Sequence, residues 1–300
     1  MTSRLVRTPA TKIVSAVASL AIIFVTATVS AEGDYFDGIE KALGVKGQVE
    51  EGTLVMCLPR SDVTVTIEGE IVPTGLGLES WIAWRYMGDD TVMMGDLALL
   101  EKEVNPVISA LQEADINIAA LHNHFAGDQP RIMFMHIEAM GKGAEIARGV
   151  KNALNKTATP LQTRAGYSQS PVQLDTRLME TVLGYSGSTW GGAFKIAVGR
   201  SGVKSYQMEM TSSMGMNSWA AFSGTNDRAH VAGDIAATAT EVSRVIRALR
   251  NGGVEVVAVH NHMLDEEPRM FFVHYWGTGP VEQLAQTVRV ALDEVDEPVR

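Results

Sequence analysis

The chain repeats one long segment of itself. Residues 95–141 recur as residues 233–279 at a constant offset of 138 positions, and further matches relate residues 43–61 to 183–201 at an offset of 140. The matched positions include Leu121-His122-Asn123-His124 with Val259-His260-Asn261-His262, Pro130-Arg131 with Pro268-Arg269, and Phe134-Met135-His136 with Phe272-Val273-His274. A unit of more than about 100 residues is long enough to enclose its own hydrophobic core. The sequence therefore predicts a duplicated domain.

Residues 1–31 are typical of a bacterial export signal. Three basic residues precede an apolar run over residues 13–29, and Val29-Ser30-Ala31 fits a small-x-small cleavage site. Serines and threonines interrupt the run and no second apolar span follows it. We therefore expect a periplasmic or secreted protein with no stable membrane insertion after cleavage; an uncleaved anchor is the alternative.

Composition limits the partners of the exported chain. Removing Arg4, Arg7 and Lys12 with the signal leaves 22 of the 25 Lys and Arg residues against 35 Asp and Glu, a net charge of −13. Because nucleic acids and anionic membrane surfaces repel a negatively charged protein, we do not expect either as a partner. Cys57 is the only cysteine, which excludes an intrachain disulfide, and we expect it to be buried in a strand.

Each repeat predicts the order strands, helix, two strands, helix. We expect a short lead-in at residues 32–42, a first repeat at 42–156, a polar linker at 157–173 and a second repeat at 174–295. In the second repeat, Thr238 and Glu241 form a capping box before a helix that ends at Gly252-Gly253. The predicted fold is α+β, with two tandem homologous domains, each a mainly antiparallel sheet with two helices, packed about a pseudo-twofold axis.

Six of the seven histidines lie in two matched triplets. These are His122, His124 and His136 in the first repeat, and His260, His262 and His274 in the second. Histidines two apart on a strand project from one face with Cα atoms about 6.5–7 Å apart, so both rings can reach one metal ion. Three imidazoles plus an open position are the ligands of a catalytic zinc site. The pattern predicts one histidine site per repeat, for a divalent metal such as zinc.

The strand geometry restricts this prediction. If His124 pairs near Arg131 across a simple hairpin, His136 falls opposite residue 119 and on the other face from the H-x-H pair. A shift of one residue returns His136 to the same face, but on the order of 13 Å from His122. A three-histidine site therefore requires a bulge, a larger loop or a different strand pairing. The alternative is a polar strand end with hydrogen-bonded imidazoles.

Other matched polar residues can complete such a site. Asp96 and Asp234 can ligate a metal, orient a histidine or act as a base, or they can be turn residues after glycine. Arg131 and Arg269 can bind a carboxylate or phosphate, or pair with a local acid. Glu103 and Glu241 fit capping better than ligation. Trp81 and Trp219 fit the core or a pocket wall, and Glu79, replaced by Asn217, can serve only the first repeat.

The repeated motif resembles the LppY/LpqO family of exported bacterial proteins. The shared pattern is Gly-Asp, a helix ending in Ala-Leu, His-Asn-His-Met/Phe, Glu/Asp-x-Pro-Arg and Phe-Phe/Met-x-His, present in both repeats. The resemblance implies export and a tandem α+β module of unknown function, and it supplies no activity or cofactor. The family's lipoprotein members imply envelope attachment, although no cysteine follows the apolar run here.

Three functions remain open from the sequence. The first is an exported binding protein with one histidine site per repeat, for a divalent metal or a small anionic ligand. The second is a metal-assisted hydrolase in which His122, His124 and His136 hold zinc. The third is a structural module of the cell envelope without metal. No spacing fixes a nucleophile or a general base, so the sequence does not decide whether the chain is an enzyme.

Overall fold

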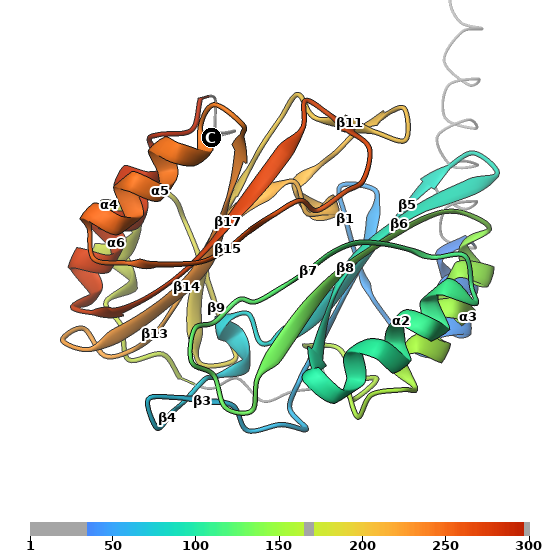
Figure 1. The fold of residues 1–300 in the computed structure, drawn as a ribbon, viewed down its shortest axis with the longest axis horizontal. Coiled ribbons are helices and arrows are strands. Elements are labelled where there is room, and N and C mark those ends of the chain that lie inside the picture. Colours follow the sequence, from blue (N-terminus) through green and yellow to red (C-terminus); the bar gives the residue numbers. More distant parts are fainter. Residues whose placement is uncertain (1–34, 165–170, 297–300) are drawn as a thin grey trace, which may run out of the picture.

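The computed structural model describes residues 35–164 and 171–296, so the predicted export signal lies outside the described residues. Each repeat forms one six-stranded antiparallel sheet (Figure 1). The first sheet runs in the order β1 (Gln48–Glu50), β2 (Thr53–Pro59), β5 (Glu79–Met87), β6 (Asp90–Leu100), β8 (Ile132–Gly141), β7 (Asn117–His122). The second runs in the equivalent order β9 (Ser188–Trp190), β10 (Ala193–Gly199), β13 (Asn217–Gly224), β14 (Ala229–Thr238), β17 (Met270–Gly279), β15 (Glu255–His260).

Helices cover the outer face of each sheet. The first repeat carries α2 (Val104–Gln112) and α3 (Gly143–Leu154), and the second carries α4 (Thr176–Leu183), α5 (Val242–Asn251) and α6 (Val281–Leu292). Residues 35–43, expected to be a short lead-in, also form a helix. Its Phe36, Ile39 and Leu43 are buried in the first core, as Met179 and Leu183 of α4 are in the second. The predicted tandem α+β architecture is confirmed, with a third helix in each half.

Half of the predicted capping box is present in the second repeat: α5 begins after Glu241, and the Thr238 hydroxyl contacts Thr240 instead of a backbone N–H. The Glu241 carboxylate accepts a hydrogen bond of 2.7 Å from the Thr238 backbone N–H, which caps the segment before α5. Arg200 donates to the same carboxylate at 3.0 Å, and Arg60 pairs in the same way with Glu103 in the first repeat at 2.9 Å. Glu103 and Glu241 therefore stabilise helix starts and belong to no ligand site.

The inner faces of the two sheets pack against each other, with the helices outermost on both sides (Figure 1). Two apolar clusters from both repeats fill this interface. One includes Phe125, Phe134, Ala221 and Ala232, and the other includes their sequence equivalents Met263, Phe272, Ala83 and Met94. Because the matched positions lie in opposite clusters, the repeats are related by a pseudo-twofold axis that passes between the two clusters.

Matched tryptophan–glycine contacts fix this arrangement. A Cβ atom on Gly77 would lie 2.7 Å from Cη2 of Trp219, and one on Gly215 would lie 2.6 Å from Cη2 of Trp81. Both glycines have left-handed backbone conformations, with φ of +91° and +85°. Each indole therefore packs directly on the other repeat's backbone, at a position that only glycine fills without strain.

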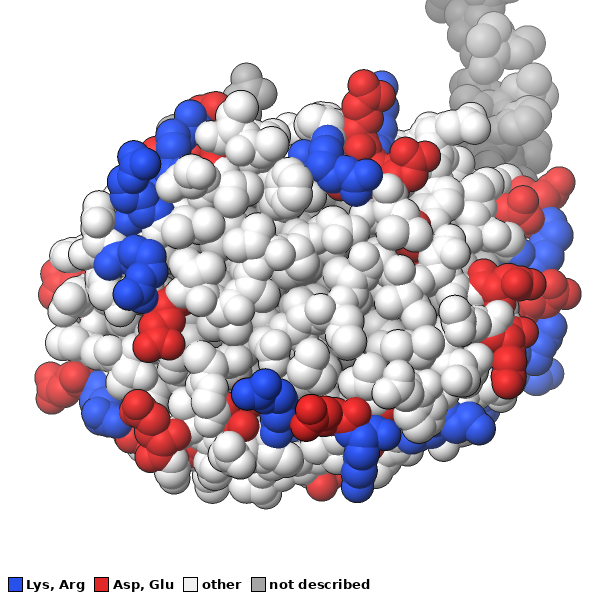
Figure 2. Space-filling view, viewed as in Figure 1, with Lys and Arg blue, Asp and Glu red and all other residues white. Residues whose placement is uncertain are grey.

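A two-stranded and a three-stranded sheet lie at the ends of the interface. They are β3 (Thr66–Ile67) with β4 (Glu70–Ile71), and β11 (Lys204–Ser205) with β12 (Met208–Glu209) and β16 (Glu266–Glu267). Short 3-10 helices are η1 (Thr74–Leu76), η2 (Glu101–Glu103) and η4 (Ser212–Met214). Across the described part of the chain, no helix is long and apolar enough to span a bilayer. Figure 2 shows that charged side chains gather along the rim of the face on which β7 and β15 lie.

Candidate metal centre at the repeat interface

Strand register places an aspartate beside a histidine in each sheet. Trp81 of β5 pairs with Asp96 of β6, and Asp96 pairs in turn with His136 of β8. The second sheet repeats this row with Trp219, Asp234 and His274. Directly opposed residues of antiparallel strands project from the same face. Each repeat therefore presents an indole, a carboxylate and an imidazole in a row across the middle of its inner face.

A β-bulge brings the H-x-H pair to the same face. Asn117 and Ile118 keep the simple hairpin register, but the register shifts by one residue between Ile118 and Ala120, so Ala120 pairs with His136. The ring centroids of His122 and His136 are 4.9 Å apart, so the expected separation of about 13 Å is wrong. His136 is two residues diagonal to His122, not four. The second repeat has the same shift between Val256 and Ala258.

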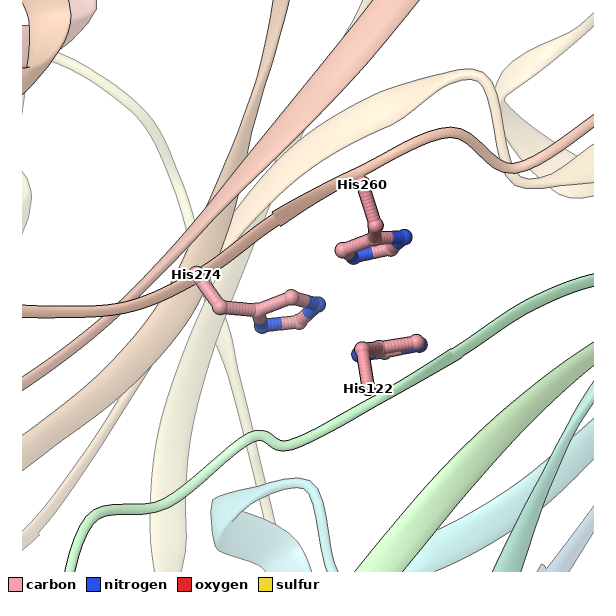
Figure 3. A group of neighbouring side chains, drawn as sticks. All are labelled: His122, His260 and His274. Atoms are coloured by element: carbon pink, nitrogen blue, oxygen red, sulfur yellow. The ribbon is translucent and has the colours of Figure 1, made fainter.

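The six matched histidines form one cluster between the repeats, which we call the histidine cluster. The rings of His122 and His260 stack with centroids 3.6 Å apart and 9° between their planes. The centroids of His136 and His262 are 3.9 Å apart, and those of His124 and His274 are 4.2 Å apart. Figure 3 shows His122 of β7 facing His260 and His274 of the other repeat. The two predicted triplets therefore meet in one cluster instead of lying apart.

The donor atoms lie at the separations that ligands of one metal ion adopt. The Asp96 carboxylate oxygens are 3.3 Å from His124 Nε2, 3.7 Å from His122 Nε2 and 3.9 Å from His136 Nε2. The Asp234 carboxylate lies 3.6 Å from His262 Nε2 and 3.5 Å from His274 Nε2. Two donors bound at about 2.1 Å to a tetrahedral metal lie about 3.4 Å apart. Both carboxylates therefore suit ligation.

Three sets of donors fall within 4.8 Å of one another, and two of them combine the repeats. The mixed sets are His122 with His260 and His274, and His136 with His260 and His262; the third is Asp96 with His122 and His124. The triplet His122, His124 and His136, expected to act alone, is not among these sets. Both imidazoles that join His122 in a three-histidine set come from the other repeat instead.

Backbone carbonyls orient several of the rings. Nδ1 of His124 lies 3.3 Å from the Gly77 carbonyl oxygen, Nδ1 of His274 lies 3.1 Å from that of Gly233, and Nδ1 of His260 lies 2.9 Å from that of Asn261. Donation by Nδ1–H fixes the tautomer that carries its lone pair on Nε2. The Nε2 atoms of all six cluster histidines are buried without a hydrogen-bond partner among the described residues. Six buried Nε2 atoms are therefore available to a ligand, and on His124, His260 and His274 the Nδ1 contact leaves the lone pair on Nε2.

Burial keeps the imidazoles neutral. It lowers the pKa of His124 to about 4 and that of His136 to about 3, and it also lowers the pKa of His260, His262 and His274. Neutral imidazole is the form that binds a metal, so these rings need lose no proton at pH 7.

The two carboxyl groups differ in their surroundings. Burial alone would raise the pKa of Asp96, but the nearby imidazoles of His136, His122 and His124 favour the ionised carboxylate and hold that pKa well below its ordinary value. Burial raises the pKa of Asp234, and the negative charge of Asp96 adds to that effect against the opposing charge of Lys195. Asp96 is therefore the carboxylate that is ionised before any cation binds.

A cavity of about 410 Å³ opens onto the cluster at the repeat interface. Its floor includes both aspartates with His124, His136 and His262, and Trp81 and Trp219 line its walls, as one alternative for these tryptophans predicted. Arg164 donates to both oxygens of the Glu79 carboxylate, at 2.8 Å from Nε and through a second contact from Nη2. Lys195 also lines the cavity, with its Nζ 4.3 Å from the centroid of the Trp219 ring.

Cys57 lies on the cavity wall rather than in a core. Its side chain is half-buried and lines the cavity, so the expected core position is wrong. Strand β2 alternates between the core and the interface, and Cys57 falls on the interface side with Val55. Burial raises the pKa of the thiol to about 11, so it is protonated at neutral pH.

The two arginines proposed as ligand contacts lie outside the cluster. Arg131 and Arg269 are both exposed, and neither lines the cavity. Arg269 donates to the Glu266 carboxylate at 3.3 Å and to the Leu264 carbonyl oxygen at 3.0 Å, which is the local pairing named as the alternative. Asn261 reaches the other repeat, where it donates to the Ala119 carbonyl oxygen at 3.1 Å.

Sequence reasoning missed Lys195 and Arg164. Lys195 occupies an alternate position in β10 that resembles a solvent face, and Arg164 lies in the segment interpreted as a linker. A signal for Lys195 existed in the repeat itself, because its counterpart at an offset of 140 is the apolar Val55. No comparable signal existed for Arg164, which has no counterpart.

Comparison with known proteins supplies a family. Among solved structures, the chain is similar to a trimeric bacterial microcompartment shell protein, PduB (13% identity, 85% of this chain and 96% of that chain, TM-score 0.23), and to EtuB from Clostridium kluyveri (10%, 84% and 94%, TM-score 0.20). These scores are too low to support an inference about fold or function. No curated protein matches the chain. The name LppY/LpqO stays a prediction, but a family model matches residues 37–156 and again 177–294, so the chain belongs to the family described as Domain of Unknown Function (DUF1259), carried twice in tandem.

Proposed function

We propose that the two repeats together bind a divalent transition metal, such as zinc, in one centre at their interface. The observation that carries this proposal is the convergence of six buried Nε2 atoms without hydrogen-bond partners among the described residues. Imidazole with carboxylate suits zinc and the neighbouring transition metals. Because zinc takes about four ligands, subsets of the cluster histidines with Asp96 or Asp234 would hold one or more ions in this centre, which would supply Lewis-acid chemistry when bound.

The energetic cost of the metal-free cluster supports this reading over a hydrogen-bonded structural role. A buried polar group without a partner costs about 1–3 kcal/mol. Six such nitrogens would cost on the order of 10 kcal/mol, which is comparable with the whole stability of a typical domain. A cation that accepts these lone pairs removes the cost. A purely structural module would be expected to satisfy its imidazoles with protein groups instead.

Metal content tests the proposal and the sharing of the centre together. The mature chain, purified without chelator or affinity-tag metal, is expected to carry transition metal by elemental analysis. The variants His122→Ala and His260→Ala remove one ligand from each repeat. With a shared centre, each variant loses most of its metal. Two independent sites would leave about half in each.

The chain offers a matched control in its seventh histidine. His230 is also buried, but its ring contacts Thr278 and Glu70 at 3.0 Å and 2.7 Å, away from the cluster. His230→Ala is expected to keep the metal content of the wild type. A wild-type protein that binds no transition metal, even after refolding with zinc, would exclude the metal centre and leave the structural module.

Metal-assisted hydrolysis is the second candidate, and the cavity favours it. A catalytic metal needs an open position that water and substrate can reach, and the cavity reaches Asp96, His124 and His136. Zinc-loaded protein is then expected to hydrolyse p-nitrophenyl esters, with the activity lost in His122→Ala and kept in His230→Ala. Metal binding without turnover would leave a binding protein.

We also propose that the protein is exported. The support is the basic and apolar pattern of residues 1–31, together with the acidic composition of the remainder. Expression in a bacterium followed by N-terminal sequencing tests this proposal. A mature chain that begins at Glu32 in the periplasm or medium is expected; retention of residues 1–31 in a membrane fraction would indicate an uncleaved anchor.

A further inference from the structure

We propose that the interface cavity binds a small organic carboxylate, with its anionic group between Lys195 and the metal centre and its carbon skeleton against Trp81 and Trp219. This inference rests on the proposed metal centre and names the class of ligand that the centre would meet. It follows from a comparison of the two halves of the cavity, which the duplication makes possible.

Part of the cavity lining is duplicated and part is not. Matched pairs of both repeats line it, namely Gly77 with Gly215, Trp81 with Trp219, Asp96 with Asp234 and His124 with His262. Other lining residues differ between the repeats. Val55 of the first repeat corresponds to Lys195 of the second, Cys57 corresponds to Ala197, and Glu79 corresponds to Asn217.

Strand register confirms that these unlike residues are structural equivalents. Val55 pairs with Ala83, and Lys195 pairs with Ala221, which is the counterpart of Ala83 at an offset of 138. Two equivalent halves that shared one task would keep equivalent walls. A cavity with some lining residues matched between the repeats and others unmatched fits a ligand that is itself asymmetric and binds in one orientation.

The charges on the walls favour an anion. Glu79 and Arg164 neutralise each other through their paired contacts. Lys195 has no ion pair among the described residues and lies over the face of Trp219. Burial lowers the pKa of its ammonium group, as expected of a cation held away from water. Lys195 is therefore the cation of the cavity that is free to meet a ligand.

The remaining acidic groups do not reverse this preference. Glu50 and Glu51 also line the cavity, but both are exposed, so solvent screens them. A divalent cation would offset the charges of Asp96 and Asp234, so they would no longer repel an anion, and an open position on the cation could accept one. One ammonium group and one open metal position suit a single carboxylate better than a phosphate, which requires more donors.

The size and walls of the cavity suit a small molecule. A volume of about 410 Å³ falls within the range of small-molecule sites. Trp81 and Trp219 supply apolar faces on opposite sides of the pseudo-twofold axis, and an aromatic or aliphatic skeleton can pack on them. Together these features give a pocket with two apolar indole faces and one ammonium group outside an ion pair.

Benzoate and benzamide test the inference, because they share a shape and differ in charge. The protein is loaded with cobalt(II), whose visible spectrum reports ligands of the metal, and is titrated with each compound. Benzoate is expected to change the spectrum and to quench tryptophan fluorescence, while benzamide does neither at the same concentrations. Lys195→Met is expected to lower benzoate affinity at least tenfold, the loss typical of one charge-assisted contact.

The control is Lys204→Met, which removes an exposed lysine of β11 outside the cavity and is expected to keep wild-type affinity. Cobalt spectra of both variants without benzoate should match the wild type, because neither lysine is a ligand. Bound cobalt with no response to benzoate, equal responses to benzamide, or an unchanged affinity in Lys195→Met would each overturn the carboxylate site while leaving the metal centre standing. Failure of the wild type to bind cobalt would overturn both proposals.

Discussion

The tryptophan–glycine contacts across the interface give a sharp test of how the repeats are joined. Replacing Gly215 by alanine places a Cβ atom 2.6 Å from Cη2 and 2.9 Å from Cζ2 of Trp81. The left-handed backbone at Gly215 costs a non-glycine residue about 1–2 kcal/mol. Overpacking against the indole adds about 1–3 kcal/mol. We expect Gly215→Ala to lower the free energy of unfolding by about 2–5 kcal/mol.

Gly202 supplies the matched control for the backbone term. Its φ is +75°, close to that of Gly215, but a Cβ atom there would meet nothing within 4 Å. Gly202→Ala is therefore expected to cost only the backbone term of about 1–2 kcal/mol. Unfolding in urea, monitored on metal-free protein, measures both variants on one scale. The difference between them isolates the contact with Trp81.

A double-mutant cycle assigns that difference to the partner in the other repeat. Trp81→Leu removes the atoms that the new Cβ would meet, so Gly215→Ala should cost about 1–3 kcal/mol less in the Trp81→Leu background. Coupling of this size between residues 134 positions apart in the sequence requires the packed interface. If Gly215→Ala costs no more than Gly202→Ala, the repeats do not pack as described and the shared cluster loses its basis.

Three other predictions concern the cluster and its cavity. Burial lowers the pKa of His124 to about 4 from an unfolded value near 6.5, so the unfolded state binds the proton first as the pH falls. Metal-free protein should therefore be most stable above pH 6.5, and its free energy of unfolding should fall by on the order of 3 kcal/mol from this group as the pH drops to about 4. Urea unfolding at each pH measures this loss, and a flat profile would contradict neutral buried rings. Zinc at a thousandfold excess over its dissociation constant should raise the free energy of unfolding by about 4 kcal/mol, and EDTA should reverse the increase. The increase should persist in His230→Ala and disappear in His122→Ala. Glu79→Gln leaves Arg164 without its partner at a site where the arginine is one-third exposed. We expect the free energy of unfolding to fall by about 1–2 kcal/mol while the metal content stays unchanged. A loss of metal as well would place Glu79 in the metal centre.

Much of this fold could be predicted because the duplication displays it twice. The H-x-H spacing correctly placed both rings of each pair on one face, and Asp96 and Asp234, for which histidine partners and turn residues were both open, lie in strands beside the histidines. The bulge could not be predicted, because the residues around it, Ile118 to Ala120 in the first repeat, carry no glycine or other local signal.

The packing of the repeats about a pseudo-twofold axis was expected, but the convergence of both histidine triplets in one cluster was not. Strand β6 is buried along almost its whole length, on both faces, so it must be covered by helices on one side and by something else on the other. Its sequence, apolar on both faces around Asp96, contained that information. A polar residue in the middle of a doubly buried strand indicates a buried polar partner, and here the partners come from both halves of the chain.

The internal repeat also separates two kinds of residue at one site. A residue near the pseudo-twofold axis contacts its own counterpart in the other repeat, as His122 stacks on His260. A change at such a position in one repeat therefore alters a contact made by the other repeat. Residues away from the axis are free to differ, and Lys195 and Glu79 do. Substitutions at Lys195 or Glu79 should therefore alter which ligand enters the cavity while the metal centre stays intact, whereas substitution of any cluster histidine should remove the centre from both repeats at once.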